Sequence, residues 1–280
     1  CSVQRRHQKL VEEAPAPGLT PAERRTLHAL AVRLGEAAGL QNAATCEFLR
    51  DPEGGTWFLE VNTRLQVEHG VSELVSGVDI VREQLRIAAG EPLAEATIAA
   101  ASRAAEPASH AIEVRLSAED PGNAFVPTPG TVGVWRMPSG PGVRVDTAIE
   151  AGDRVPPDYD NLIAKILVHA GDRDAAIDRL RRALDEVAVS GVQTTLPFHR
   201  FVAESAAFRE ASLATDWVDR HWTAATAAAA REAAAGTARL VAALAADAAG
   251  EATTQGRVDH AGAPPWRVVG RRAAVERWPR

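Results

Sequence analysis

The segment from Glu60 to Glu68 alternates at every position between polar and less polar side chains, and it constrains the fold more than any other part of the sequence. Successive side chains of an extended strand point to opposite faces. One face would carry Val61, Thr63, Leu65 and Val67, and the other Glu60, Asn62, Arg64, Gln66 and Glu68. A half-buried strand with a solvated outer face shows the same alternation. The polar face lacks lysine, however, and it mixes carboxylate, amide and guanidinium groups, so we interpret it as a binding surface.

A hairpin is predicted directly before this surface. Two short apolar runs, 44–50 and 56–62, flank the turn sequence DPEGG at 51–55, which is typical of a β-hairpin. Glu47 in the first run has a place equivalent to that of Glu60 in the second. Two carboxylates and the Asn62 amide form the hard oxygen site that Mg²⁺ prefers. The sequence therefore predicts a metal site across the hairpin.

The other elements indicate an α+β protein. Thr20 and Glu23 form a capping box for a helix that ends at Gly39, and Asp79 begins a helix that ends at Gly90. Residues 92–109 are weakly patterned and are interpreted as a connection between two lobes. The second lobe is predicted to hold antiparallel strands at 110–117, 131–137, 142–149 and 161–170, and a helix from Asp172 with Ile177, Leu180, Leu184 and Val187 on one face.

Composition excludes several classes of protein. The 280 residues have a net charge of −6 with no basic stripe, which argues against a nucleic-acid partner. No apolar run approaches the roughly 20 residues that span a bilayer, and no secretory leader is recognisable. Two cysteines are too few for a disulfide framework. We therefore expect a cytoplasmic protein. Because the chain opens at Cys1 inside a dense polar motif, we interpret it as a fragment.

An ordered series of segments resembles the biotin carboxylases of the ATP-grasp superfamily. It comprises CSVQRRHQK at 1–9, EEAP at 12–15, EFL at 47–49, FLEVNTRLQVEH at 58–69, GVDIVREQLRIAAGEP at 77–92, HAIEVRL at 110–116, YDNLIAK at 159–165 and GVQT at 191–194. The resemblance extends from residue 1 to about Trp217. One departure is Gly70, where the family usually has proline, and it puts the geometry after Glu68 in question.

The resemblance implies a role for each matching residue. The implied catalytic residues are Glu68, Arg64 and Arg115. Glu68 is implied as the general base that deprotonates bicarbonate, and Arg115 as the group that stabilises the enolate-like oxygen of biotin. The implied bicarbonate contacts are Lys9, Arg64, Gln66 and Val67, the implied Mg²⁺ (or Mn²⁺) ligands are Glu47, Glu60 and Asn62, and the implied ATP contacts are Gln4, His7, Glu47, Leu49 and Glu60. Judged alone, His7 and Lys9 are ordinary surface residues and Arg115 is a strand-face charge. Only the cluster at 60–68 stands out without the family.

The resemblance also implies a domain order and partners. Residues 1–93 would be the C-terminal lobe of an ATP-grasp domain, 94–109 a connection, 110–217 a biotin carboxylase C-terminal domain, 218–255 an alanine-rich helical linker and 256–280 an unassigned tail. The glycine-rich flap and phosphate-binding lysines of the family do not occur in the sequence, so we expect the chain alone to be inactive. Biotin would sit on a separate carrier protein or module, since the only methionine, Met137, lacks the carrier's lysine motif. A carboxyltransferase subunit and a second copy of the chain are the other implied partners.

Two alternatives remain at this stage. One is another ATP-grasp carboxylate–amine ligase that does not use biotin. The other is a non-catalytic scaffold remnant. The acyl acceptor is not encoded in the segments that carry the resemblance, although the alanine-rich linker favours an acyl-CoA carboxylase.

Overall fold

The computed structural model describes residues 2–51 and 53–235. Contacts group the chain into two units, Cys1–Ala230 and Arg231–Arg280. All elements discussed below belong to the first unit. Most of the predicted linker at 218–255 and the whole tail at 256–280 lie outside the described residues.

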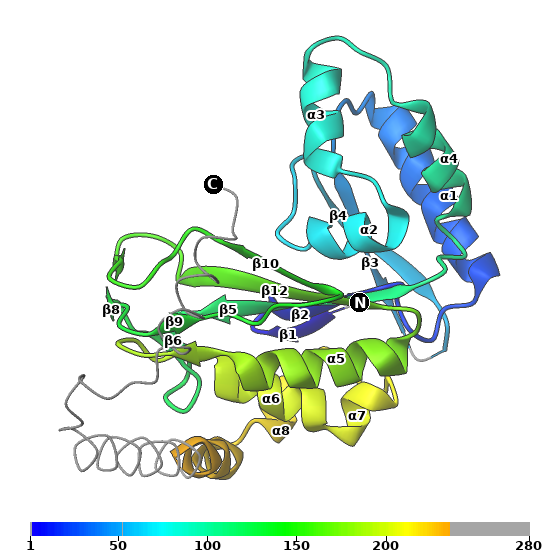
Figure 1. Ribbon diagram of the computed structural model, residues 1–280. Helices are drawn as coiled ribbons and strands as arrows, with labels where there is room; N and C mark the ends of the chain where they lie inside the picture. Colours follow the sequence, from blue (N-terminus) through cyan, green and yellow to red (C-terminus); the bar gives the residue numbers. More distant parts are fainter. Residues whose placement is uncertain (1, 52, 236–280) are drawn as a thin grey trace, which may run out of the picture. The chain divides into compact units, whose positions relative to one another are not determined.

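A five-stranded antiparallel sheet organises this unit (Figure 1). Its strand order is β1-β2-β5-β12-β10, with β1 at Ser2–Arg5, β2 at Gln8–Ala14, β5 at His110–Ser117, β12 at Leu162–Ala170 and β10 at Val143–Thr147. The antiparallel strands expected in the second lobe are confirmed. The first two strands, from the beginning of the chain, join the same sheet by pairing with β5. The sheet therefore links both ends of the region that carries the resemblance.

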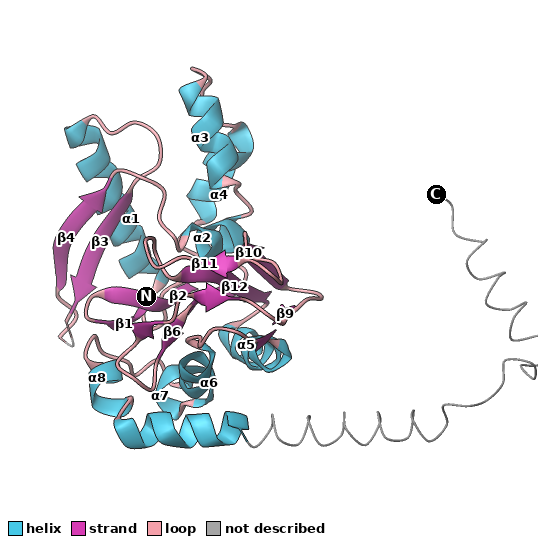
Figure 2. Cartoon of the chain, turned by 90° about the vertical axis from the view of Figure 1, so that its left-hand side faces the viewer, coloured by secondary structure: helices cyan, strands magenta, loops and turns pink. Residues whose placement is uncertain are grey.

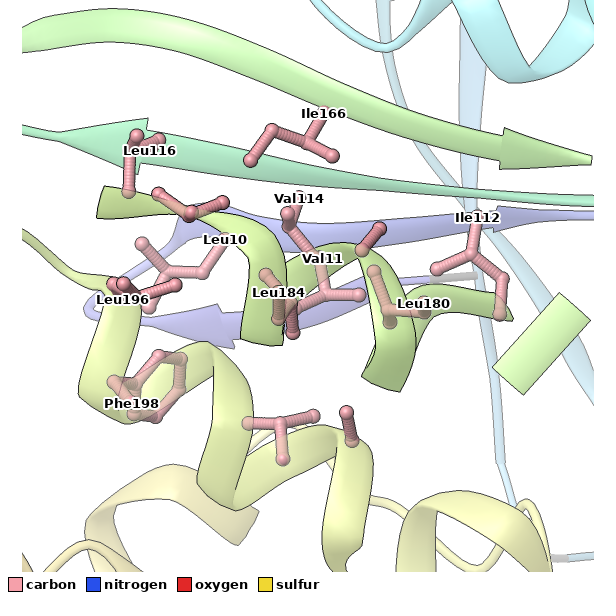
Figure 3. Close-up of a cluster of buried hydrophobic side chains, with 14 of the residues drawn as sticks. Leu10, Val11, Ile112, Val114, Leu116, Ile166, Leu180, Leu184, Leu196 and Phe198 are labelled. Atoms are coloured by element: carbon pink, nitrogen blue, oxygen red, sulfur yellow. The ribbon is translucent and has the colours of Figure 1, made fainter. Parts of the chain in front are cut away.

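Helices cover one face of the sheet and close the core. They are α5 (Arg173–Glu186), α6 (Leu196–Glu204), α7 (Ala206–Arg209) and α8 (Trp217–His221). Asp172 caps α5 by accepting a hydrogen bond from the Ala175 amide at 2.8 Å. As predicted, Ile177, Leu180 and Leu184 are fully buried. Figure 3 shows Leu180 and Leu184 packed below the sheet residues Val11, Ile112 and Val114. This face is mostly apolar, and its exception is Glu13, which pairs with His110 and with Arg173 of α5. Glu12, Glu113 and Arg115 project to the other face of the same strands.

Short ladders surround the end of the sheet. They pair β6 (Glu119–Asp120) with β7 (Val126–Pro127), β8 (Gly130–Thr131) with β11 (Arg154–Val155), and β9 (Trp135–Arg136) with β13 (Ala188–Val189). The single strand predicted at 131–137 is therefore wrong, because the run is divided between two ladders. Gly191 occupies the left-handed region at φ +94°, and a Cβ there would collide with the Thr131 carbonyl oxygen.

The remaining elements lie on the other side of the sheet. They are α1 (Pro21–Ala38), β3 (Thr45–Arg50), β4 (Thr56–Asn62), α2 (His69–Ser76), α3 (Ile80–Ala88) and α4 (Glu95–Arg103). The predicted hairpin is confirmed as β3–β4, which forms its own two-stranded sheet (Figure 2). The capping box of α1 is confirmed, with Thr20 Oγ1 accepting from the Glu23 amide and Glu23 Oε2 accepting from the Thr20 amide. Asp79 caps α3.

One sequence expectation needs correction here, and one segment contains a helix that its pattern did not indicate. The alanine-rich run at 92–109, interpreted as a connection between two lobes, contains α4 in its middle. Alanine's high helix propensity outweighs the weak apolar pattern. The extended segment expected from Glu60 to Glu68 ends at Asn62, and Glu68 is already the residue before α2. Among the described residues, we find no helix with the length and apolar character that would let it span a bilayer.

Candidate functional site

Lys9 joins the hairpin to the start of α2. Its Nζ donates to Glu47 Oε1 at 2.8 Å and to Glu68 Oε1 at 2.6 Å. Burial acts to lower the pKa of Lys9, but the two carboxylates outweigh it and raise the pKa above its ordinary value. Lys9 is therefore a fixed cation between two carboxylates that the sequence places 21 positions apart.

The hairpin brings three oxygen-bearing side chains together. Glu47 on β3 lies directly opposite Glu60 on β4. The Asn62 amide donates to Glu47 Oε1 at 3.2 Å and to Glu60 Oε1 at 2.7 Å. No group of three or more His, Cys, Asp or Glu side chains in the described part of the chain is placed to hold a metal ion. The donor set at the hairpin is instead two carboxylates and one amide, which suits Mg²⁺ or Mn²⁺ with phosphate and water as further ligands.

Glu68 is the residue on which the site converges. It occupies the N-cap position of α2 but makes no side-chain cap. Its carboxylate instead accepts from Lys9 and, through Oε2, from Arg115 Nη2 at 2.9 Å. Burial acts to raise the pKa of Glu68, but the ammonium and the guanidinium lower it below its ordinary value. Glu68 is therefore ionised near neutral pH.

Arg115 is held from both sides of its strand. Its side chain donates from Nε to Glu12 Oε1 at 2.6 Å and pairs with Glu68. Its carbonyl accepts from Thr195 Oγ1 at 3.1 Å and from His199 Nε2 at 2.6 Å. Burial lowers the pKa of His199 to about 4, so the ring is neutral and donates through Nε2. The position of Arg115 is thus fixed by four separate residues.

The loop after β4 does not form the polar face that alternation predicted. Arg64 is exposed and, within residues 2–51 and 53–235, donates only to its neighbour's carbonyl, Leu65 O, at 3.2 Å. The Gln66 amide nitrogen is buried and has no partner among the described residues. A buried donor without a partner is costly, and an anion bound there would satisfy it. The Val67 carbonyl accepts from Lys165 Nζ at 3.0 Å, which ties the loop to β12.

Gln4, His7 and Leu49, three of the implied nucleotide contacts, lie outside the Lys9–Glu68 cluster. Gln4 lies opposite Lys9 in the β1–β2 ladder. His7 sits in the turn between these strands at φ +66°, next to Arg6 at +49°, a conformation that residues other than glycine rarely adopt. Leu49 is 42% exposed on β3. Within the described residues, no side-chain hydrogen bond or ion pair joins these three to the Lys9–Glu68 cluster.

Sequence reasoning missed the buried ionic residues beneath the site. Glu12 and Glu113 lie directly opposite each other on β2 and β5, at 3% and 0% exposure. Lys165 lies opposite Arg115 on β12 and within 3.9 Å of Glu113. The signal was the two charges at positions 113 and 115 of an otherwise apolar strand, because same-face charges of a buried strand need partners. The partners depend on the register between strands, and the sequence of that segment alone does not determine the register.

Gly70 permits α2 to lie close to this charged face. A Cβ at Gly70 would collide with Leu167 Cδ2 and approach Glu113 Oε2 to 3.1 Å. The Arg144–Glu73 ion pair, at 2.7 Å, links the same helix to β10. The departure at Gly70 noted in the sequence is therefore accommodated by the side chains beneath it.

Comparisons with known proteins match both parts of the chain. Residues 1–96 match the ATP-binding domain of the carbamoyl-phosphate synthase L chain, and residues 113–220 match the biotin carboxylase C-terminal domain. A pyruvate carboxylase subunit of Methanothermobacter thermautotrophicus is 46% identical over 221 residues, which are 79% of this chain and 44% of that protein. Biotin carboxylase of Pseudomonas aeruginosa is 47% identical over 208 residues, 74% of this chain and 45% of that protein.

Solved structures agree with these relatives. The biotin carboxylase domain of a thermophilic 2-oxoglutarate carboxylase bound to bicarbonate superimposes with a TM-score of 0.75 at 42% identity, over 79% of this chain and 49% of that one. The Hydrogenobacter thermophilus domain dimer, in complex with MgADP, ADP and bicarbonate, also gives 0.75 at 42% identity, over 79% of this chain and 48% of that one. This chain therefore spans about half the length of the proteins that it matches.

Proposed function

The chain belongs to the biotin carboxylase family, and from that premise we propose that the protein to which it contributes uses ATP and bicarbonate to carboxylate biotin. The observation that carries the proposal is Glu68, an ionised carboxylate held between Lys9 and Arg115 next to the carboxylates of the hairpin. A base, two cations and a metal-type donor set in one cluster suit the activation of a small anion for attack on a phosphate.

In the first step of the proposed reaction, Glu68 is the base. Glu68 accepts the bicarbonate proton, and the bicarbonate oxygen attacks the γ-phosphorus of ATP, which yields carboxyphosphate and ADP. Lys9 holds the anion near Glu68. The Gln66 amide, unpartnered among the described residues, and the backbone of Val67 offer further contacts, and Arg64 is free to turn toward the same anion because its guanidinium is exposed. These roles follow from charge, hydrogen-bonding capacity and the family's pattern.

The hairpin would bind the metal–nucleotide side. Glu47, Glu60 and Asn62 supply oxygen ligands for Mg²⁺ or Mn²⁺, and a divalent ion there neutralises negative charge on the ATP phosphates. Gln4, His7 and Leu49 are proposed nucleotide contacts at the rim. In this arrangement the hydrogen bond from Lys9 to Glu47 connects the two halves of the site.

In the second step of the proposed reaction, Arg115 stabilises negative charge on biotin. Carboxyphosphate breaks down to carbon dioxide and phosphate, the phosphate removes the ureido proton of biotin, and the ureido nitrogen attacks carbon dioxide. Negative charge develops on the ureido oxygen, which Arg115 stabilises by donating to it. The match of residues 113–220 to a biotin carboxylase domain, with Arg115 inside it, favours biotin over an amine acceptor.

The proposed partners follow the relatives. They are a biotin carrier protein or module, a carboxyltransferase subunit and a second copy of the chain, and a cytoplasmic location is proposed with them. The acyl-CoA carboxylase α3 subunit of Mycobacterium leprae, 45% identical over 226 residues, supports an acyl-CoA carboxylase. A pyruvate or 2-oxoglutarate carboxylase is the alternative among the relatives.

The test is bicarbonate-dependent release of phosphate from MgATP in the presence of free biotin. We would compare this chain, a longer protein that contains it, and the longer protein with Glu68→Gln. We expect little activity from the chain alone and activity in the longer protein that Glu68→Gln abolishes. Release that needs neither bicarbonate nor biotin would point to another ATP-grasp ligase. An inactive longer protein that still binds its partner subunits would identify a scaffold.

A further inference from the structure

Glu12 contacts Arg115 but has no part in the steps above. Its Oε1 accepts from Arg115 Nε at 2.6 Å and also pairs with Nη2. Glu12 is 3% exposed, so neither bicarbonate nor biotin reaches it without rearrangement. Glu12 would therefore act on the reaction only by positioning Arg115, because it contacts the guanidinium from its buried side and does not contact the reacting groups.

The pairing leaves one edge of the guanidinium available. Nε and Nη2 are committed to Glu12 and Glu68, whereas Nη1 has no hydrogen-bond partner among the described residues. A guanidinium is planar, so a carboxylate that binds two of its nitrogens fixes the direction of the third. Thr195 and His199 fix the carbonyl of the same residue. Arg115 is thus aimed by its surroundings before any substrate binds.

Glu113 is the buried cross-strand neighbour of Glu12. Glu12 Oε2 and both carboxyl oxygens of Glu113 are buried and have no hydrogen-bond partner among the described residues. Burial raises the pKa of Glu113 to about 8 and that of Glu12 to about 7, where Arg115 opposes the rise. Lys165 Nζ lies 3.9 Å from Glu113 Oε2 and Arg115 pairs with Glu12, so each of the two buried carboxyls has a cationic neighbour of its own.

We propose that Glu12 is a positioning residue that aims Arg115 at the ureido oxygen of biotin while Glu68 holds the other side of the guanidinium. The inference rests on the proposed function, since only a biotin substrate gives Arg115 that target. It predicts a division between the two steps. Formation of carboxyphosphate needs Glu68, whereas stabilisation of the biotin oxygen needs a correctly aimed Arg115.

The experiment uses the longer protein that contains this chain, with MgATP, bicarbonate and free biotin. Phosphate release is measured with and without biotin for the wild type and for Glu12→Gln. We expect the biotin-dependent part of kcat to fall about 10- to 100-fold, as for a misplaced catalytic group. The bicarbonate-dependent release without biotin should change less than about 3-fold. Equal losses in both, or no loss in either, would overturn the proposal.

Glu13→Gln is the matched control. Glu13 is the next residue on the same strand, is 6% exposed and pairs with His110 and Arg173 instead of Arg115. It reports what the loss of a buried, paired carboxylate does to β2, and it should lower the melting temperature without a selective loss of the biotin-dependent rate. If it reproduces the selective loss, Glu12 has no special role.

Two further measurements keep the outcome decisive. If Glu12→Gln does not fold, Glu12→Asp retains the charge but withdraws it by one methylene, and it should give a smaller loss of the same selective kind. A crystal structure of the variant that folds tests the geometry without activity. Rotation of the Arg115 guanidinium away from its wild-type direction is expected, and an unchanged guanidinium would refute the proposal. A wild type that shows no biotin-dependent release would instead refute the proposed function.

Discussion

Two regions of this molecule differ sharply in how they bury their apolar side chains. The sheet lobe, defined as β1, β2, β5, β10 and β12 with α5–α8, fully buries Phe198 and Leu180 between sheet and helices. The hairpin region, defined as α1, β3, β4 and α3, leaves Trp57 61% and Leu85 68% exposed. Helix α1 has no buried residue at all. One region closes its own core, and the other presents an apolar surface to its surroundings.

The candidate site has residues in both regions, and each part of the site is packed as its region is. Glu68 and Arg115 are held by the sheet lobe through buried partners such as Glu12 and His199. Glu47 and Glu60 stand on the hairpin region, where packing alone does little to hold them. The part of the site around Glu68 and Arg115 is therefore formed within this chain. Under the proposed function the hairpin would hold the metal, and because its apolar side chains are exposed we expect little activity from this chain alone.

The largest effect should come from a cavity in the sheet lobe. Phe198→Ala removes a ring that is fully buried and packs edge-on against Phe125 and Trp222, with centroids 5.4 and 5.3 Å away. We expect the free energy of unfolding to fall by about 3–5 kcal/mol. Urea unfolding followed by circular dichroism measures it. Phe58→Ala, on the exposed hairpin, is the matched control and should cost much less. Equal costs would end the distinction between the regions.

The pH dependence of stability should come from the buried carboxyls of the sheet lobe. Folded Glu113 keeps its proton up to a pKa of about 8, whereas the unfolded chain releases it near 4.5. The free energy of unfolding should therefore fall as the pH rises from about 5 to 8, by on the order of 3 to 4 kcal/mol, since each unit of pKa difference corresponds to roughly 1.4 kcal/mol.

Glu113→Gln removes that titration and should flatten the decline. Glu12, whose pKa is also raised, would still contribute a smaller slope. Chemical unfolding of both proteins at pH 5, 6.5 and 8 makes the comparison. Parallel curves for the wild type and the variant would mean that Glu113 is ionised in the folded protein.

A smaller effect is expected at the start of α1 in the hairpin region. Thr20→Ala removes the side chain that accepts the Glu23 amide and breaks the capping box. We expect a loss of about 1 kcal/mol in helix stability, seen as faster amide hydrogen exchange in the first turn of α1. Exchange in β5 and β12 should not change, because the sheet lobe does not depend on this helix for its core. Uniformly faster exchange would show that the two regions unfold together.

The smallest effect should follow Leu85→Ala in this chain. The side chain is mostly exposed on α3, so its removal should change the free energy of unfolding by less than about 0.5 kcal/mol. In a longer protein that covers the hairpin region, the same substitution should cost about 2 kcal/mol or more. Thermal melts of both proteins, with and without the substitution, separate these cases. The same small cost in both would show that the surface stays open.

Local patterns predicted the parts of the fold that local interactions decide. The capping box at Thr20 and Glu23, the turn of the β3–β4 hairpin and the apolar face of α5 each involve residues close in sequence, and all three are confirmed. The strand expected through Glu68 was wrong beyond Asn62. Alternation of polar and apolar residues favours an extended strand, but the chain leaves that conformation before Glu68 because α2 begins directly after it.

Long-range pairing decided the rest of the site. The cluster of Lys9, Glu47 and Glu68 could be expected only by resemblance, because no local rule brings β2, β3 and the residue before α2 together. Glu12 and Glu113 went unnoticed for the same reason, since their significance comes from the β2–β5 register. Polar residues of unremarkable local sequence acquire their chemistry from that register. The roles assigned to the site residues remain predictions.

The most direct test of the account is transfer of labelled carbon from bicarbonate to biotin. A longer protein that contains this chain would be incubated with MgATP, ¹³C-bicarbonate and free biotin, beside its Glu68→Gln variant. We expect labelled carboxybiotin from the wild type and a loss of about 100-fold or more in the variant, as for the removal of a general base. Undiminished labelling by Glu68→Gln, or ATP cleavage by the wild type without any label in biotin, would contradict it.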